Sequence, residues 1–327
     1  MAMERVPYLV GGGFEHSAEV MRAMLAAATS GAEGIVNSGD MKVQPLSVPG
    51  TSVRVAPGNA LIRNSYGGGT AQTYAARASS QTTVPIQATG SAGGRADLVV
   101  ARIDDPTYQG GSFDPATFEA ARFEVIEGVS ASATSVAGLG LTYPAIALAR
   151  LNIPASTGTI TSEMITDLRA VALPRSQRYL FTHGLVPGEQ DSLDYAAAGG
   201  EDGEAWPNIF WQAYIPEWAQ RVRIRGFWGQ VRVPGTGANN LGKLWVRIGT
   251  MPNGFSSQVV NWDNPSTGGV TRQTYMVAAD RSVPAEFRGS TRQVYLRGST
   301  DLDNTNVPRL DSVSAISLDL EFYETAV

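Results

Sequence analysis

Residues able to carry out catalysis are scarce in this chain of 327 residues. It has only two histidines, His16 and His183, so a metal site that needs two or three imidazoles is poorly supplied. Glycan hydrolysis needs only a pair of carboxylates. The candidate carboxylates are Asp191, Asp194, Glu201, Asp202 and Glu204. They lie among alanines and glycines, and a segment of that composition holds catalytic groups poorly. We therefore expect a protein that is not an enzyme.

A calcium site is the one cofactor that the residue pattern suggests. Asp301, Asp303 and Asn306 supply side-chain oxygens at alternating positions, which suits the oxygen shell of calcium. The EF-hand pattern is not met, because the sixth position is Asn306 instead of glycine and the twelfth is Ser312 instead of glutamate. A solvated turn is the alternative, and we expect no obligatory cofactor.

Binding chemistry is better represented than catalysis in the second half of the chain. Around positions 221–225, 244–248, 294–297 and 316–323, aliphatic residues alternate with arginine, tryptophan, tyrosine and a few carboxylates. This period of two places the aliphatic residues in a core and the alternating set on the other face of each strand. Trp228 joins that set if its strand resumes in register after Gly226.

The predicted outer-face set is Arg223, Arg225, Trp228, Trp245, Arg247, Tyr295, Arg297 and Tyr323. Large aromatic side chains outside a core are usually covered by another surface. Three interpretations stay open for these residues: a subunit interface, a platform for sugars, or scattered surface residues. In the segment Asn261-Trp262-Asp263, an aromatic ring lies between planar polar side chains, so Trp262 is the best single candidate for a glycan contact.

One helix is predicted near the start of the chain. Ser17 can cap it, Glu19 lies in its first turn, and Gly31 can end it. Its apolar stripe, at helical spacing, consists of Val20, Met21, Met24, Leu25 and Ala28. The stripe either packs on the chain's own sheet or forms an oligomer interface with symmetry mates.

The remaining pattern predicts a mainly β protein of two domains. From Met41 onward the pattern is that of strands, and the continuous apolar run at 98–101 is typical of a strand buried on both faces. Periodicity lapses at Leu173-Pro174-Arg175-Ser176, which separates a β-rich domain with one helix, residues 1–174, from residues 175–327. The second domain is expected to be an antiparallel β-sandwich like a jelly roll. Its expected strands span 208–215, 221–233, 243–248, 271–278, 292–297 and 313–323.

Composition limits the partners. The net charge of −5 argues against a general nucleic-acid binder, because phosphate binding needs a basic surface. Without cysteine, neither disulfides nor thiolate metal sites are available. No apolar run is long enough for a membrane span and no signal segment is recognisable, so we expect synthesis in a cytoplasm and no membrane insertion.

Five segments in the first half resemble the amino-terminal half of minor tail and baseplate proteins of phages that infect actinobacteria. They are PYLVGGG at 7–13, SVRVAPGNA at 52–60, RADLVVARIDD at 95–105, ALARLNIP at 147–154 and ITDLR at 165–169. The resemblance covers roughly residues 1–172 and lies in the order and spacing of the segments, since each is a weak motif by itself.

The resemblance implies a non-catalytic structural protein of the virion tail tip that supports assembly and host attachment. It implies a homotrimer whose first domain docks to other tail or baseplate proteins. The second domain would then be a host-contact or tail-assembly module. A receptor-binding, lectin-like module for host cell-wall polysaccharide is the alternative, and a glycan depolymerase is a weaker one.

Overall fold

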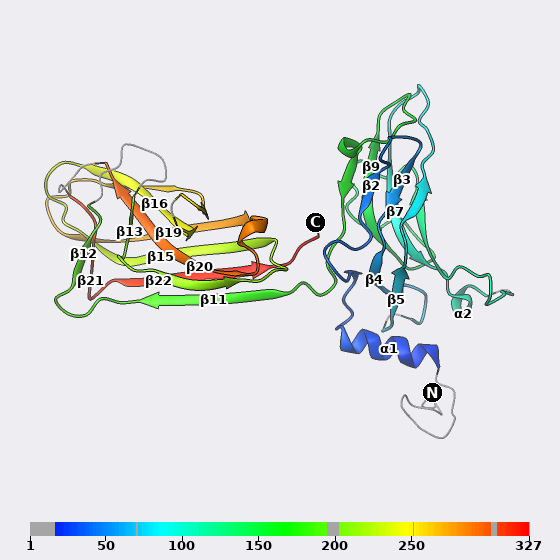
Figure 1. Ribbon diagram of the computed structural model, residues 1–327, viewed down its shortest axis with the longest axis horizontal. Helices are drawn as coiled ribbons and strands as arrows, with labels where there is room; N and C mark the ends of the chain where they lie inside the picture. Colours follow the sequence, from blue (N-terminus) through cyan, green and yellow to red (C-terminus); the bar gives the residue numbers. More distant parts are fainter. Residues whose placement is uncertain are drawn as a thin grey trace, which may run out of the picture. The chain divides into compact units, whose positions relative to one another are not determined.

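The computed structural model describes residues 17–69, 71–110, 112–194, 203–250, 252–301 and 306–326. It divides into two compact units, Met1–Pro174 with Thr325–Val327, and Arg175–Glu324. Both units are built of antiparallel sheets, so the predicted mainly β class is confirmed (Figure 1). Among the helices of the described residues, none has the length and apolarity needed to span a membrane.

The described part of the first unit contains one full helix and ten strands. Its elements are α1 Ala18–Ala28, β1 Gly34–Ile35, β2 Val43–Pro45, β3 Ser52–Val55, β4 Gly58–Arg63, β5 Thr73–Ala78, β6 Thr82–Pro85, β7 Arg95–Ile103, α2 Pro106–Gln109, β8 Ala121–Ile126, β9 Ala145–Ile153, a 3-10 turn Ser162–Met164 and β10 Ile165–Asp167. They form a four-stranded sheet of order β10-β9-β7-β8 and two three-stranded sheets of orders β1-β4-β5 and β2-β3-β6.

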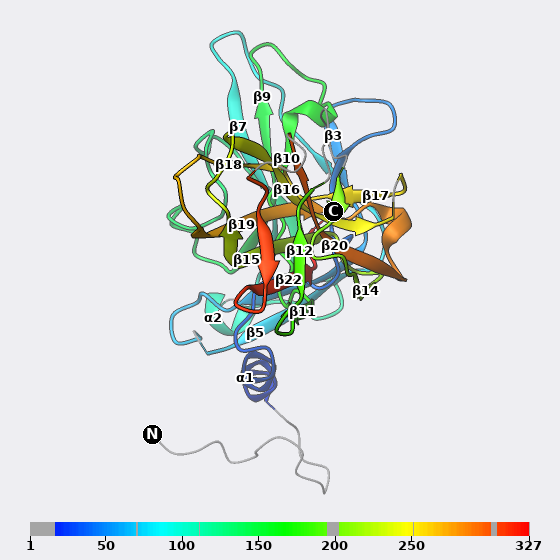
Figure 2. The ribbon, with the colours of Figure 1, turned by 90° about the vertical axis from the view of Figure 1, so that its left-hand side faces the viewer.

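Strand β7 is central to this unit, because it is buried on both faces as its apolar run predicts. Val99 faces the main core with β3, β4 and β9, whereas Leu98 and Val100 face a second, smaller core. Helix α1 begins at the predicted cap, where Ser17 Oγ accepts from the Val20 N–H at 3.1 Å. The helix packs beside β5, and Figure 2 views it nearly along its axis.

The second unit has the strand order of a jelly roll. Its elements are β11 Ser176–His183, β12 Gln190–Ser192, β13 Glu204–Ala205, β14 Trp211–Ile215, β15 Arg221–Val233, β16 Asn240–Gly249, β17 Gly254–Ser256, β18 Val260–Asn264, β19 Thr271–Ser282, a 3-10 turn Ala285–Phe287, β20 Ser290–Thr300, β21 Arg309–Asp311 and β22 Ala315–Tyr323. One sheet pairs β11-β22-β15-β19 and the other pairs β14-β20-β16-β18. Numbered along the chain, these eight strands have the orders 1-8-3-6 and 2-7-4-5, as the crossing connections of a jelly roll require.

The two sheets of this sandwich meet through the aliphatic residues that alternate along their strands. Val222 and Ile224 of β15 and Leu244 and Val246 of β16 are all buried in one core. At Gly226 the sheets approach so closely that a Cβ atom would lie 2.8 Å from Leu296 Cδ2. The prediction that the aliphatic set forms the core is therefore confirmed.

Candidate assembly and attachment surfaces

Helix α1 turns its charged side chain toward its own unit. The Arg22 guanidinium lies 3.1 Å from the Asp105 carboxylate, and its Nε donates to Gln72 Oε1 at 2.7 Å. The same cation lies 5.0 Å from the ring centre of Tyr74 and 5.8 Å from that of Tyr108. Such ring faces attract a desolvated cation. An arginine therefore contributes to the contact between the helix and its unit, together with the buried Ala26.

The apolar stripe of α1 lies largely on the exposed side of the helix. Met21 and Met24 are each 45% exposed and Ala28 is exposed, whereas Val20 and Leu25 are half-buried. Because each helix residue turns by about 100°, Met24 projects roughly opposite to Arg22. The alternative in which the stripe packs on the chain's own sheet is wrong for Met21, Met24 and Ala28. Whether a second subunit covers them stays a prediction.

Asp105 is the residue that holds this arrangement together. It is the second residue after β7, accepts from Tyr74 Oη at 2.8 Å and caps α2 by accepting from the Thr107 N–H at 2.9 Å. Burial by itself raises the pKa of Asp105, but these hydrogen bonds and the Arg22 charge outweigh it and hold the pKa below its ordinary value. Burial and the hydrogen bond to Asp105 raise the pKa of Tyr74.

Asp104 is held just as firmly by a second set of partners. It pairs with Arg102 and, at 2.6 Å, with Arg122, and it accepts from Gln109 Nε2 at 2.8 Å. The Arg102 guanidinium also lies 3.5 Å above the ring of Tyr143. Burial raises the pKa of Asp104, and these donors and cations lower it by more. Both carboxylates stay ionised and engaged, which suits anchoring and leaves neither as a proton donor.

Neither aspartate was identified as a site residue from the sequence. The available signal was a pair of carboxylates directly after the continuous apolar run 98–101, within the segment 95–105. A buried strand that ends in two acidic residues predicts that they meet buried partners, because isolated charges are too costly to bury. The partners Arg22 and Arg122 could not be named from the sequence.

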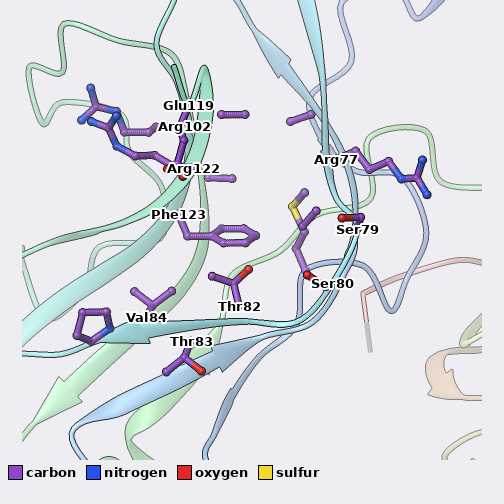
Figure 3. A pocket seen from close by; sticks show the side chains of 16 residues that line it. Arg77, Ser79, Ser80, Thr82, Thr83, Val84, Arg102, Glu119, Arg122 and Phe123 are labelled. Carbon is purple, nitrogen blue, oxygen red and sulfur yellow. The ribbon is translucent and has the colours of Figure 1, made fainter. Parts of the chain in front are cut away.

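A cleft of about 460 Å³ opens in the first unit between the β5–β6 connection and β8. In Figure 3 the Phe123 ring points into it, whereas the side chains of Arg77 and Arg122 point away. Ser79, Ser80 and Thr82 add hydroxyl groups at its border. Glu119 and Arg102 also border the cleft, and Arg102 is paired with Asp104 and Glu124. The described residues include no metal-binding cluster of His, Asp and Glu.

The predicted outer-face set of the second unit divides between two faces that point away from each other. Arg223, Arg225 and Tyr323 belong to the β15–β22 sheet, whereas Arg247, Tyr295 and Arg297 belong to the β16–β20 sheet. The single face expected from the sequence is therefore wrong. Alternation along a strand assigns a side but cannot say which strands share a sheet, since pairing in a jelly roll joins strands that are distant in sequence.

On the β15–β22 sheet the predicted residues form cross-strand ion pairs. Arg223 lies 3.0 Å from Glu321 and 4.4 Å from the ring centre of Tyr323, and Arg225 lies 3.6 Å from Asp319. The two arginine side chains are exposed and their partners are half-buried. Ion pairs at a surface contribute little to stability.

Both tryptophans of the predicted outer-face set are buried. Trp228 is 0% exposed, and its Nε1 donates to the Trp206 carbonyl at 2.8 Å. It lies in the core because the even-numbered positions of β15 face inward without interruption to 228, so that Phe227 takes the outer position. Trp245 is on the outer side of β16, as predicted, but is also 0% exposed. Gly203 covers it so closely that a Cβ there would lie 2.5 Å from the indole Cη2.

The other predicted residues of the β16–β20 sheet are only partly accessible. Arg247 is buried, with its guanidinium donating to Ser256 Oγ at 3.2 Å and to the Pro252 carbonyl at 3.1 Å. Tyr295 and Arg297 are half-buried, and Arg297 donates to the Gly203 carbonyl.

Trp262 is not available as a glycan contact. Residues 260–264 form β18, and alternation along this strand turns Trp262 into the core while Asn261 and Asp263 stay exposed. The indole lies against Gly242, where an added Cβ would come within 2.6 Å of its Cζ2. A glycan site at Trp262 is therefore wrong.

The weaker candidates are only partly described. Asp303, Glu201, Asp202 and His16 lie outside the described residues. Asn306 is buried and its Oδ1 accepts from the Gly235 N–H at 2.7 Å, so this oxygen already has a structural partner. Calcium binding stays a prediction.

The acidic segment of the second unit is described at three carboxylates. Asp191 Oδ2 accepts from the Asn208 N–H at 2.8 Å, and Glu204 Oε1 accepts from the Asp194 N–H at 2.9 Å. Burial raises the pKa of Asp191. His183 is half-buried at the end of β11. Each of the two hydrogen-bonded carboxylates shapes the local backbone, and catalysis by this segment stays untested.

Comparison with known proteins gives no family. No family model matches the chain, and no curated protein matches it. Among solved structures, the VP2 subviral particle of infectious bursal disease virus is 13% identical over 89% of this chain and 70% of that chain, with a TM-score of 0.28. The T13 viral particle of the same virus is 11% identical over 90% and 72%, with a TM-score of 0.27.

A carbohydrate-binding module of the β-sandwich superfamily is also similar, at 9% identity over 88% of this chain and 99% of that chain, with a TM-score of 0.17. Similarities at these TM-scores do not establish a shared fold, and no property of these proteins is carried over to this chain.

Proposed function

We propose that this protein is a non-catalytic structural component of a phage tail tip or baseplate, and that it self-associates through helix α1. The sequence resemblance over residues 1–172 supports the particle. One structural observation supports the mode of assembly: α1 is tied to its unit by the buried Arg22–Asp105 pair while Met21 and Met24 face outward.

The occupant of this helix face is a second copy of the chain. A surface helix normally buries its apolar side and exposes its charged side, whereas α1 directs Arg22 to its own unit and leaves Met21 and Met24 exposed. Full burial of a methionine side chain is worth roughly 1.5–3 kcal/mol, so related copies of α1 that meet around a symmetry axis gain from every Met21 and Met24 that they cover. The resemblance to trimeric tail proteins selects three copies.

The oligomeric state tests this assembly. Light scattering on the full chain at micromolar concentration is expected to give the mass of a trimer. The double substitution Met21→Glu and Met24→Glu is expected to give monomers, because carboxylates cannot be buried in the interface at low cost. Val48→Glu, at an exposed apolar position of the same unit outside α1, is the matched control and should remain a trimer.

Two results would contradict the proposal. One is a monomeric wild type, and the other is a variant that is still a trimer with both substitutions in α1. The virion role is tested separately, since peptides of this chain are expected in purified particles of the phage that encodes it.

Attachment to the host is the second part of the proposal. Several copies on one particle would engage a repetitive wall polymer at once, so weak individual sites would add up to stable attachment through effective concentration. Attachment without hydrolysis predicts that the protein binds wall glycans and releases no reducing ends from them. Contacts with neighbouring tail proteins would be made by the surfaces of both units outside the exposed face of α1.

A further inference from the structure

An open cleft on the second unit has the chemistry of a sugar site. It measures about 380 Å³ and is lined by Ala205, Asn208, Ile209, Phe210 and Tyr295. Small-ligand sites span roughly 300–1,000 Å³. The first four residues belong to β13 and its connection to β14, and Tyr295 belongs to β20, which pairs with both strands.

Two aromatic rings form the apolar part of the cleft. Phe210 is 50% exposed, and its ring centre lies 5.9 Å from that of Tyr295 at an interplanar angle of 48°. The two rings therefore present differently inclined faces to a ligand. The axial C–H groups of a pyranose form a flat apolar patch that packs on such a face.

The polar groups near the rings include two amides, Asn208 in the lining and Gln212 on β14, beside the buried Arg247 that is the register partner of Tyr295. Asn208 and Gln212 are exposed, and Gln212 is the register partner of Gln293 on β20. Tyr295 Oη donates to Gln293 Oε1, which fixes the phenol and the amide together. None of the five described lining residues is charged. Neutral amides beside aromatic rings suit the hydroxyl groups of an uncharged sugar better than a charged peptide or a phosphate.

The cleft rests on a rigid base. Trp206 is fully buried directly before the lining segment, and its Nε1 donates to the Asp191 carbonyl at 3.1 Å. The Trp206 N–H donates to the Leu296 carbonyl at 2.9 Å, and the Trp206 carbonyl accepts from Trp228 Nε1. Asp191 Oδ2 in turn holds the Asn208 N–H. A binding site whose groups are fixed before the ligand arrives loses less entropy on binding.

We propose that this cleft is a subsite for a neutral glycan, with a sugar ring stacked on Phe210 or Tyr295 and hydroxyl groups bonded to Asn208 and Gln212. The inference rests on the proposed attachment function and gives it a place and a ligand class. Phe210 and Tyr295 take the place of Trp262 as candidate glycan contacts, because Trp262 is buried in the core.

The test measures binding of the full-length oligomer to soluble neutral polysaccharides: an arabinogalactan, a mannan, an α-glucan and a β-glucan. Affinity gel electrophoresis against each polymer is the readout, followed by calorimetry with an oligosaccharide of the polymer that retards the protein. At least one polymer is expected to retard the wild type. Phe210→Ala and Tyr295→Ala are each expected to weaken binding about tenfold, which corresponds to about 1.4 kcal/mol.

Two variants make the result specific. Phe227→Ala removes a partly exposed phenylalanine from the opposite sheet and should bind as the wild type does. Tyr295→Phe keeps the ring and loses the hydrogen bond to Gln293, so it should keep most of the affinity. Equal melting temperatures of the variants would show that lost binding is not lost folding.

The proposal is overturned if no polymer in the panel is bound at millimolar sugar concentration, or if binding is unchanged in both alanine variants. A loss of tail incorporation by Tyr295→Ala without any glycan binding would assign the cleft to another tail protein and also overturn it. The assembly proposal fails on different evidence, a monomeric wild type or absence from purified particles, so the two failures can be told apart.

Discussion

The Arg22 guanidinium of α1 and the carboxylate of Asp105, two residues after the end of β7, lie 3.1 Å apart, and their side chains are only 12% and 10% exposed. This pair joins the amino-terminal helix to the central strand of its unit. Tyr74 and Gln72 add hydrogen bonds to its two ends. The outward position of Met21 and Met24 therefore follows from a buried ion pair.

Arg22→Ala should release α1 without unfolding the rest of the unit. It leaves the Asp105 carboxylate buried without its cation, and breaking such a pair costs about 3–5 kcal/mol when both groups are buried. Since the main contact of α1 is with β5, an edge strand of its sheet, the loss should appear as faster hydrogen exchange at residues 18–28. Arg77→Ala, at an exposed arginine of the same unit, should leave that exchange unchanged. Equal protection in both variants would mean that the pair does not hold the helix.

The first unit should lose stability on acidification in a defined window. Asp104 and Asp105 have pKa values below their ordinary value of 3.8 in the folded protein. A lowered folded pKa means that the unfolded chain binds protons first, so the contribution is fully present above pH ~4 and is lost as the pH falls through the folded pKa. Acid denaturation curves, with hydrogen exchange at residues 95–126 as the readout, would measure this loss of stability. The paired change Asp104→Asn and Asp105→Asn should flatten the acid dependence, and an unchanged slope would contradict the assignment.

Gly226 should tolerate no side chain. A Cβ there would lie 2.8 Å from Leu296 Cδ2 and 2.9 Å from Val246 Cγ2, on the opposite sheet of the sandwich. Gly226→Ala is therefore expected to cost about 1–3 kcal/mol through overpacking. Gly269→Ala, where nothing lies within 4 Å of the new atom, is the control and should be nearly neutral. Chemical denaturation of both variants checks this, and equal stabilities would show that the sheets can separate locally.

The sequence predicted what depends on neighbours along one strand. The alternation of Val222 with Ile224 and of Leu244 with Val246 places these residues in the core, and the structure agrees. The exposure of Trp245 could not be predicted, because Gly203 on a different segment covers it. The Arg22–Asp105 pair could not be predicted either, because its two residues come from distant segments of the chain. Strand sides are encoded by period, but the cover over an outer face and the partners of a buried charge depend on the tertiary arrangement.

The difference between period and context is sharpest at Trp262. The flanking Asn261 and Asp263 suggested a glycan contact, whereas β18 turns the indole into the core, 6.4 Å from the ring of Tyr275. Trp262→Ala should therefore act on stability, with a loss of about 3–5 kcal/mol from the cavity that it leaves. Trp262→Phe should recover part of that loss. Melting curves and glycan binding of the same variants test this prediction. A Trp262→Ala variant that kept its stability and lost only sugar binding would contradict the buried position of Trp262.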